Sequence, residues 1–201
     1  MLIFHPGGFI FNSSATRGAG NAARRGGFEA RIVDYPLADV PAAVNMSLRL
    51  AKRLHRHGRT VYAYGESAGG TLALLLAERG LVRAAAAQAP VSDIPGWIVS
   101  TGNDVNQLAQ VLKLDQTQLT ELSPDTHETR SPIMAETPVN DPISATTDSW
   151  AASRPLVKAV PVPGAHLDPA YRASNVTLAM RFLTQRRRAD MAGRSLGTIR
   201  Y

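Results

Sequence analysis

The stretch Gly65-Glu66-Ser67-Ala68-Gly69, followed by Gly70, decides the fold of this chain. The residues before it, 61–64, are apolar and resemble a short buried strand, and residues 71–78 are strong helix formers. A G-x-S-x-G sequence between a strand and a helix is typical of a sharp turn that presents the serine hydroxyl outward. Glycines flank such a turn because a Cβ atom there would collide with the neighbouring strand or helix. Ser67 is therefore a candidate nucleophile at a helix N-terminus, where backbone N–H groups stabilise negative charge.

A second glycine motif lies at the start of the chain. The apolar residues 2–4 lead directly into His5-Pro6-Gly7-Gly8-Phe9. In H-G-G-G-type loops, backbone N–H groups after a strand form part of an oxyanion hole, and the residue after the nucleophile supplies the rest. Pro6 replaces the first glycine of that pattern and has no N–H to donate. The alternative is an ordinary glycine-rich turn, which the presence of two motifs in the right order makes weaker. We assign the oxyanion donors to Gly7, Gly8 and Ala68.

Three motifs in order carry a resemblance to a known family. His5-Pro6-Gly7-Gly8-Phe9, residues 33–38 (Val-Asp-Tyr-Pro-Leu-Ala) and residues 65–70 resemble H-G-G-G-F, D-Y-R-L-A-P-E and G-D-S-A-G-G of the hormone-sensitive-lipase-like branch of the α/β-hydrolases. The chain departs from them at Pro6, at Pro36 and at Asp39-Val40. The resemblance covers almost the whole chain and implies a mostly parallel sheet of about six strands with helices on both faces, lacking the family's first two strands and N-terminal cap. It also implies a triad in the order Ser, Asp or Glu, His.

The general base is sought among five histidines. His5 belongs to the first glycine motif, His55 and His57 end a helix, and His127 lies in a polar segment. Only His166 follows an apolar strand near the C-terminus and precedes a final helix, and its loop resembles the one that carries the family's base. We assign the base to His166, although a lone loop histidine is more often a solvated surface residue.

The acid has more than one candidate. Glu136, Asp141 and Asp148 all follow the expected strand near 132–136, and Asn140-Asp141-Pro142-Ile143 resembles the family's D-P-[LI] stretch. The spacing to His166 leaves room for one helix and one strand. We favour Asp141, with Glu136 as the alternative because it lies closest to the strand end. A turn or helix-cap role ahead of Ser144 is the other interpretation of Asp141.

The remaining sequence indicates a single globular domain. Its 201 residues are enough for one sizeable core, and the hydrophobic share of 44% and charged share of 19% are ordinary. Strands and helices alternate, as in a parallel sheet covered on both faces. Strands are expected near 2–4, 30–34, 60–64, 83–88, 132–136 and 156–162, and helices near 16–26, 41–57, 68–79, 104–113, 144–152 and 170–187. Residues 91–131 are expected to form a small lid, with a capped helix start at 114–119, and residues 188–201 a flexible tail.

The composition limits which partners and cofactors we expect for this chain. The chain has no cysteine, and no cluster of His, Asp and Glu has metal-ligand spacing, so we expect no metal and no cofactor. The net charge of +6 comes from arginines scattered on helix faces, such as Arg49 and Arg59, without interleaved aromatics. We therefore expect neither nucleic-acid binding nor stable membrane association.

The N-terminus starts at the equivalent of the family's third strand. This start leaves the strand near 30–34 as a bare sheet edge, and we expect a homodimer through that edge. A misassigned start codon is the alternative. Residues 2–4 are too short for a secretory signal, and no basic segment precedes them, so we expect a cytoplasmic protein.

Together these patterns predict a serine-dependent hydrolase of small-molecule carboxylic esters with small or medium acyl chains. Thioester or amide hydrolysis, or acyl transfer or cyclisation, would use the same groups and remains open. The remaining alternative is a binding protein that keeps the fold without turnover.

Overall fold

The sheet of the computed structural model, which describes residues 1–193, has six strands, all parallel to their neighbours. Their order across the sheet is β2-β1-β3-β4-β5-β6. The bounds are β1 Leu2–Phe4, β2 Arg31–Val33, β3 Ala63–Glu66, β4 Ala85–Gln88, β5 Ile133–Pro138 and β6 Val157–Val162. The expected parallel sheet of about six strands is confirmed. Since the strands are parallel, their carboxyl ends lie at one edge, where the loops gather the candidate site residues.

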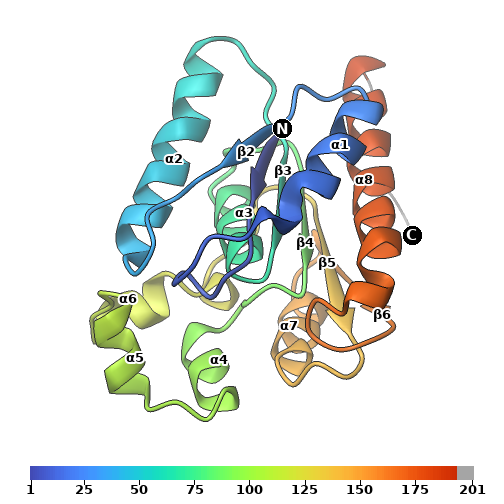
Figure 1. Cartoon of the computed structure of the whole chain (residues 1–201). Coiled ribbons are helices and arrows are strands. Elements are labelled where there is room, and N and C mark those ends of the chain that lie inside the picture. Colours follow the sequence, from blue (N-terminus) through green and yellow to red (C-terminus); the bar gives the residue numbers. More distant parts are fainter. Residues whose placement is uncertain (194–201) are drawn as a thin grey trace.

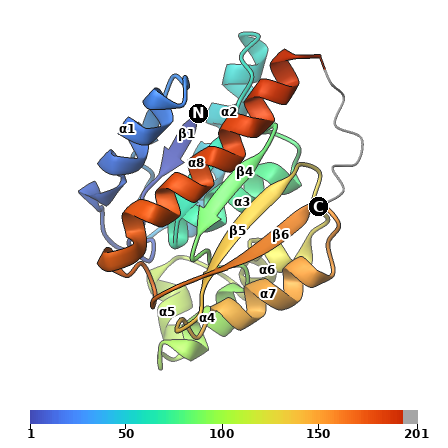
Figure 2. The same cartoon turned by 90° about the vertical axis from the view of Figure 1, so that its right-hand side faces the viewer.

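Helices cover both faces of the sheet (Figures 1 and 2). Helices α1 (Arg17–Arg25) and α8 (Pro169–Met191) pack on one face, where Ile3, Tyr64 and Met134 form part of the core. Helices α2 (Val40–Arg56), α3 (Ala68–Glu78) and α7 (Ser144–Ala152) pack on the other face, against Leu2, Ala63 and Ile133. Short 3-10 turns span Ser14–Thr16 and Pro124–Thr126. The two cores explain why strand residues on both faces are apolar.

Helix α3 is the central helix of the fold. Every one of its residues is buried, and its apolar residues are distributed around the helix rather than along one stripe. It starts directly after Ser67 and contacts β1, β3 and β4. Burial on all sides holds the helix N-terminus, and with it Ser67, in a fixed position.

Residues 91–131 contain three short helices at the carboxyl edge of the sheet (Figure 1). These are α4 (Ile94–Ser100), α5 (Val105–Val111) and α6 (Gln116–Glu121), capped by the side chains of Asp93, Asp104 and Asp115. Helices α5 and α6 match the expected elements near 104–113 and 114–119. Helix α4 was not expected, because Pro95 and Gly96 disfavour helix. Proline is tolerated in the first turn, and Asp93 accepts a hydrogen bond from the Gly96 N–H at 3.0 Å.

Two boundaries differ from the sequence prediction. Strand β3 begins at Ala63 rather than near residue 60, and it continues to Glu66, so the turn at Ser67 follows the strand without a spacer. Helix α8 runs to Met191, beyond its expected end near 187. The first residues of the expected flexible tail, 188–191, are therefore helical, and residues 194–201 lie outside the described residues.

Strand β2 is one edge of the sheet. Arg31 at its start is exposed and Val33 at its end is buried. Homodimer formation at this edge stays a prediction. Among the described residues, no helix is both long and apolar enough to cross a membrane.

Candidate active site

Ser67 occupies a strained turn between β3 and α3. Its φ of 52° lies in the left-handed region, which L-residues other than glycine rarely adopt. The glycines on either side leave no room for a side chain: a Cβ atom on Gly65 would lie 2.0 Å from the Gly69 carbonyl oxygen, and one on Gly69 would lie 2.4 Å from that of Phe4. The expected elbow is therefore formed by direct backbone packing of β3, α3 and β1.

His166 reaches Ser67 from the loop between β6 and α8. The Ser67 hydroxyl lies 2.9 Å from His166 Nε2, and His166 Nδ1 lies 2.6 Å from Asp141 Oδ2. Because a carboxylate only accepts hydrogen bonds, Nδ1 carries the imidazole proton and Nε2 accepts from the serine. The structure thus brings together the three residues selected from the sequence, in the geometry of a nucleophile, a base and an orienting acid.

Asp141 is held in place by its own loop. Its side chain is only 2% exposed, and its second oxygen, Oδ1, accepts a hydrogen bond from the Ile143 N–H at 3.2 Å. The residue that precedes α7 as its N-cap is Ile143, so Asp141 does not cap this helix. Its carboxylate therefore bridges a local turn and His166.

Glu136, the alternative acid, lies elsewhere. It pairs in register with Gln88 of β4 and is fully buried on the sheet face covered by α8. Neither of its carboxylate oxygens pairs with another side chain among the described residues. Burial is the main cause that raises its pKa to about 9; the nearby Glu66 carboxylate adds to the shift, and the backbone of Ala179 opposes it. The structure does not bring Glu136 to His166.

The first glycine motif forms a tight loop after β1. Gly7 has a φ of 135°, and a Cβ atom there would lie 1.9 Å from the Phe11 carbonyl oxygen, so only glycine fits. Gly8 also has a positive φ, 59°. Ala68 is the first residue of α3, and an N–H in that position has no acceptor within its helix. The loop that carries Gly7 and Gly8 therefore packs, at Gly69, against the helix start that carries Ala68.

Comparison with known proteins agrees with this geometry. A family model described as alpha/beta hydrolase fold matches residues 1–123. This chain is an α/β-hydrolase. The family resemblance drawn from the three motifs is thereby confirmed, and so is its assignment to an enzyme family. No curated protein matches the chain in sequence.

Solved structures share the fold of this α/β-hydrolase at low sequence identity. A hyperthermophilic esterase from the archaeon Pyrobaculum calidifontis superposes with a TM-score of 0.70 and 19% identity, over 92% of this chain and 75% of the other. EstE1, a thermostable carboxylesterase from a metagenomic library, gives a TM-score of 0.73 and 21% identity, over 92% and 79%. An esterase of Thermogutta terrifontis, with propionate bound, gives a TM-score of 0.72 and 20% identity, over 92% of this chain and 82% of the other.

An apolar rim borders the site of this hydrolase. The ring of Trp97, from α4, lies 3.7 Å from the position of a Cβ atom on Gly8, so the segment 91–131 contacts the glycine loop. Ile10 and Phe11, on the same loop, are 44% and 63% exposed. Trp97 belongs to the expected lid segment 91–131, but the sequence could not indicate its contact with Gly8, because that contact depends on where α4 packs.

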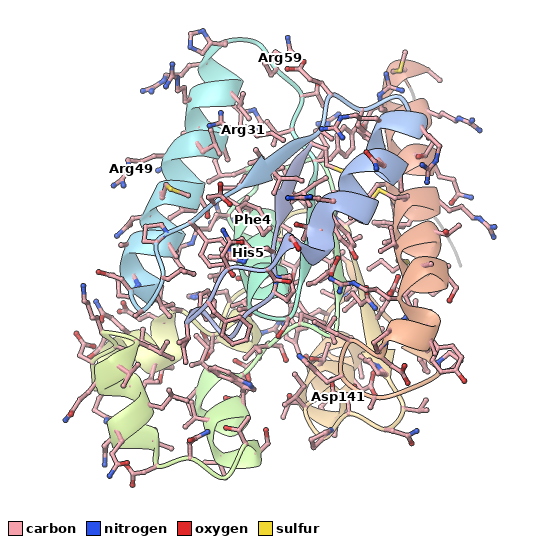
Figure 3. All side chains as sticks on the ribbon, viewed as in Figure 1. Phe4, His5, Arg31, Arg49, Arg59 and Asp141 are labelled. Atoms are coloured by element: carbon pink, nitrogen blue, oxygen red, sulfur yellow. The ribbon has the colours of Figure 1, made fainter. Side chains whose placement is uncertain are left out.

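The basic residues Arg31 and Arg59 lie away from this edge (Figure 3). A cavity of about 1030 Å³ is lined by Met1, Arg31, Arg59 and Asp190 among others, and by none of Ser67, Asp141 or His166. Figure 3 shows Arg31 and Arg59 toward one end of the molecule and Asp141 toward the opposite end. Within the described part of the chain, no group of three or more His, Asp or Glu side chains could hold a metal ion.

Proposed function

We propose that this α/β-hydrolase cleaves carboxylic esters through an acyl-enzyme formed on Ser67. The hydrogen-bonded series from Ser67 through His166 to Asp141 is the observation that carries the proposal. The esterase and carboxylesterase activities named for the similar structures support it.

In the first step, Ser67 Oγ attacks the acyl carbon and passes its proton to His166 Nε2. Asp141 stabilises the resulting imidazolium and keeps the ring oriented. Backbone N–H groups of Gly7, Gly8 and Ala68 stabilise the tetrahedral oxyanion, and one such donor is worth about 3–4 kcal/mol in other hydrolases. His166 then gives the proton to the departing alcohol, and water, activated by the same imidazole, releases the acid.

Access of water favours hydrolysis over acyl transfer. The His166 side chain is 38% exposed, so water reaches the imidazole that must activate it. The exposed Ile10 and Phe11 beside the oxyanion loop suit an acyl chain, and we assign small or medium acyl groups because the rim is modest in area.

A panel of p-nitrophenyl esters from acetyl to dodecanoyl, with matched thioesters and anilides, tests the proposal. We expect ester cleavage with the highest kcat/KM among the short and medium acyl groups, and loss of about 10⁴-fold or more in Ser67→Ala. Faster cleavage of the thioesters or anilides than of the esters would assign a different acyl substrate. A folded protein that cleaves none of them would support the binding-protein alternative.

A further inference from the structure

A row of buried polar side chains lies directly behind the nucleophile turn. Glu66, Gln88 and Glu136 pair in register across β3, β4 and β5, and all three are fully buried. They lie on the sheet face that α8 covers, together with Tyr64 two residues before Glu66. Burial of a glutamate side chain costs folding free energy unless the carboxyl group is paired or protonated, so each glutamate of this row needs a partner or a proton.

Glu66 is the paired member of the row. Arg172, from the first turn of α8, forms an ion pair with Glu66 Oε2. The Tyr64 hydroxyl lies 3.2 Å from Glu66 Oε1 and also 3.2 Å from Gln88 Oε1. Desolvation raises the pKa of Glu66, and the charge of Arg172 opposes that shift. The ion pair therefore compensates the burial of the carboxylate.

Glu66 and Arg172 are each close in sequence to a triad residue. Glu66 directly precedes Ser67, and its strand ends there. Arg172 follows His166 through the short loop that enters α8. The ion pair thus joins the turn that carries the nucleophile to the helix that follows the base.

The His166 loop depends on that helix for its position. The Asp168 side chain caps α8 by accepting from the Ala170 N–H at 2.9 Å, and the Asp168 N–H donates to the Ala165 carbonyl at 3.2 Å. A Cβ atom on Gly164 would lie 2.7 Å from the ring of Tyr171, so the loop packs directly on the first turn of α8. A shift of that turn would move His166 relative to Ser67.

We propose that Glu66 and Arg172 are positioning residues, whose ion pair sets the distance between Ser67 and His166. The inference rests on the proposed triad chemistry. Misplacement of reacting groups by about 1 Å can cost about 100-fold in rate. Loss of the pair therefore lowers kcat, while KM, which reflects contacts of the bound substrate with the apolar rim, changes little.

Helix α8 provides its own matched control. At its C-terminal end, Asp190 accepts a hydrogen bond from the Tyr62 hydroxyl and forms an ion pair with Arg83 at 3.2 Å. This contact also ties α8 to the sheet region, but at the end opposite the triad (Figure 2). Asp190→Asn should therefore lower stability without changing kcat.

The test measures kcat, KM and Tm for wild type, Glu66→Gln, Arg172→Lys and Asp190→Asn with the best ester of the panel. We expect the first two variants to lose tenfold or more in kcat with KM within a factor of about two. The Asp190→Asn variant should keep the wild-type kcat. A double variant, Glu66→Gln with Arg172→Met, should regain stability over Arg172→Met alone without regaining kcat, because it removes the unpaired buried charge.

Two outcomes would overturn the inference. One is wild-type kcat in folded Glu66→Gln and Arg172→Lys proteins. The other is a loss of kcat in Asp190→Asn that, for the same fall in Tm, is as large as the loss in Glu66→Gln. Absence of activity in the wild type would instead contradict the proposed ester hydrolysis. Failure of the ion-pair inference and failure of the proposed function therefore give different results.

Discussion

The hydroxyl of Tyr35 donates a hydrogen bond to the carbonyl oxygen of His5 at 2.7 Å, and the rings of the two residues stack 4.1 Å apart with an interplanar angle of 9°. Both residues are buried. Tyr35 belongs to the second sequence motif, and His5 begins the glycine loop that we propose as part of the oxyanion hole. The second motif therefore supports the first, since the tyrosine fixes the loop on which Gly7 and Gly8 lie.

Tyr35→Phe should loosen this loop. The change keeps the ring stack but leaves the buried His5 carbonyl without its donor, which costs about 1–3 kcal/mol. We expect lower stability by that amount and a fall in kcat that exceeds any rise in KM, measured by denaturant unfolding and ester hydrolysis. Tyr62→Phe is the control, because its hydroxyl contacts Asp190, far from the triad. Equal kcat in both variants would show that the contact with His5 does not support catalysis.

Gly69→Ala should be strongly destabilising. The new Cβ atom would lie 2.4 Å from the Phe4 carbonyl oxygen and 2.5 Å from that of His5, so β1 and α3 would have to separate. We expect a loss of more than about 2 kcal/mol in the free energy of unfolding.

The matched control is Gly18→Ala in α1, where a Cβ atom meets nothing within 4 Å. This change should leave stability unaltered or increase it by up to about 1 kcal/mol, because alanine favours helix. Similar unfolding midpoints for the two variants would contradict the tight packing of α3 on β1.

Glu136→Gln should change how stability depends on pH. The pKa of Glu136 is raised from 4.5 to about 9 in the folded protein, mainly by burial. Between these values the unfolded chain releases the proton while the folded protein keeps it, so the free energy of unfolding falls as pH rises. For one carboxyl the slope is at most about 1.4 kcal/mol per pH unit.

The Gln variant cannot ionise, so its stability relative to wild type should increase from acid to alkaline pH across this window. Denaturant unfolding at several pH values measures the difference. Glu78, whose pKa burial also raises to about 9, should show the same behaviour in Glu78→Gln. A difference from wild type that stays constant with pH would mean that Glu136 is ionised in the folded protein.

The sequence allowed the fold and the candidate triad to be predicted because their signals are local. Ser67 follows a strand and starts a helix, and His166 follows the last strand. In a parallel sheet both positions lie at the carboxyl edge whatever the details of packing. Asp141 was harder to select, since Glu136 has the same side-chain chemistry and lies closer to the strand.

The face on which a residue lies could not be predicted. In a strand buried on both faces, the hydrophobic pattern does not alternate, so nothing in residues 133–138 indicates that Glu136 points toward α8. The ion pair of Glu66 with Arg172 joins residues far apart in sequence and depends on the packing of α8. Helix α4 was missed because proline and glycine generally disfavour helix, and both are tolerated here only because they lie in the first turn, after the Asp93 cap.

We infer that Ser67 is a nucleophile activated by His166 and Asp141. Labelling with a fluorophosphonate probe, compared between wild type, Ser67→Ala, His166→Ala and Asp141→Asn, tests it most directly. We predict rapid labelling of wild type, none in Ser67→Ala, and strongly slowed labelling in the His166 and Asp141 variants. Labelling of the Asp141 and His166 variants at the wild-type rate, or no labelling of folded wild type, would contradict the claim.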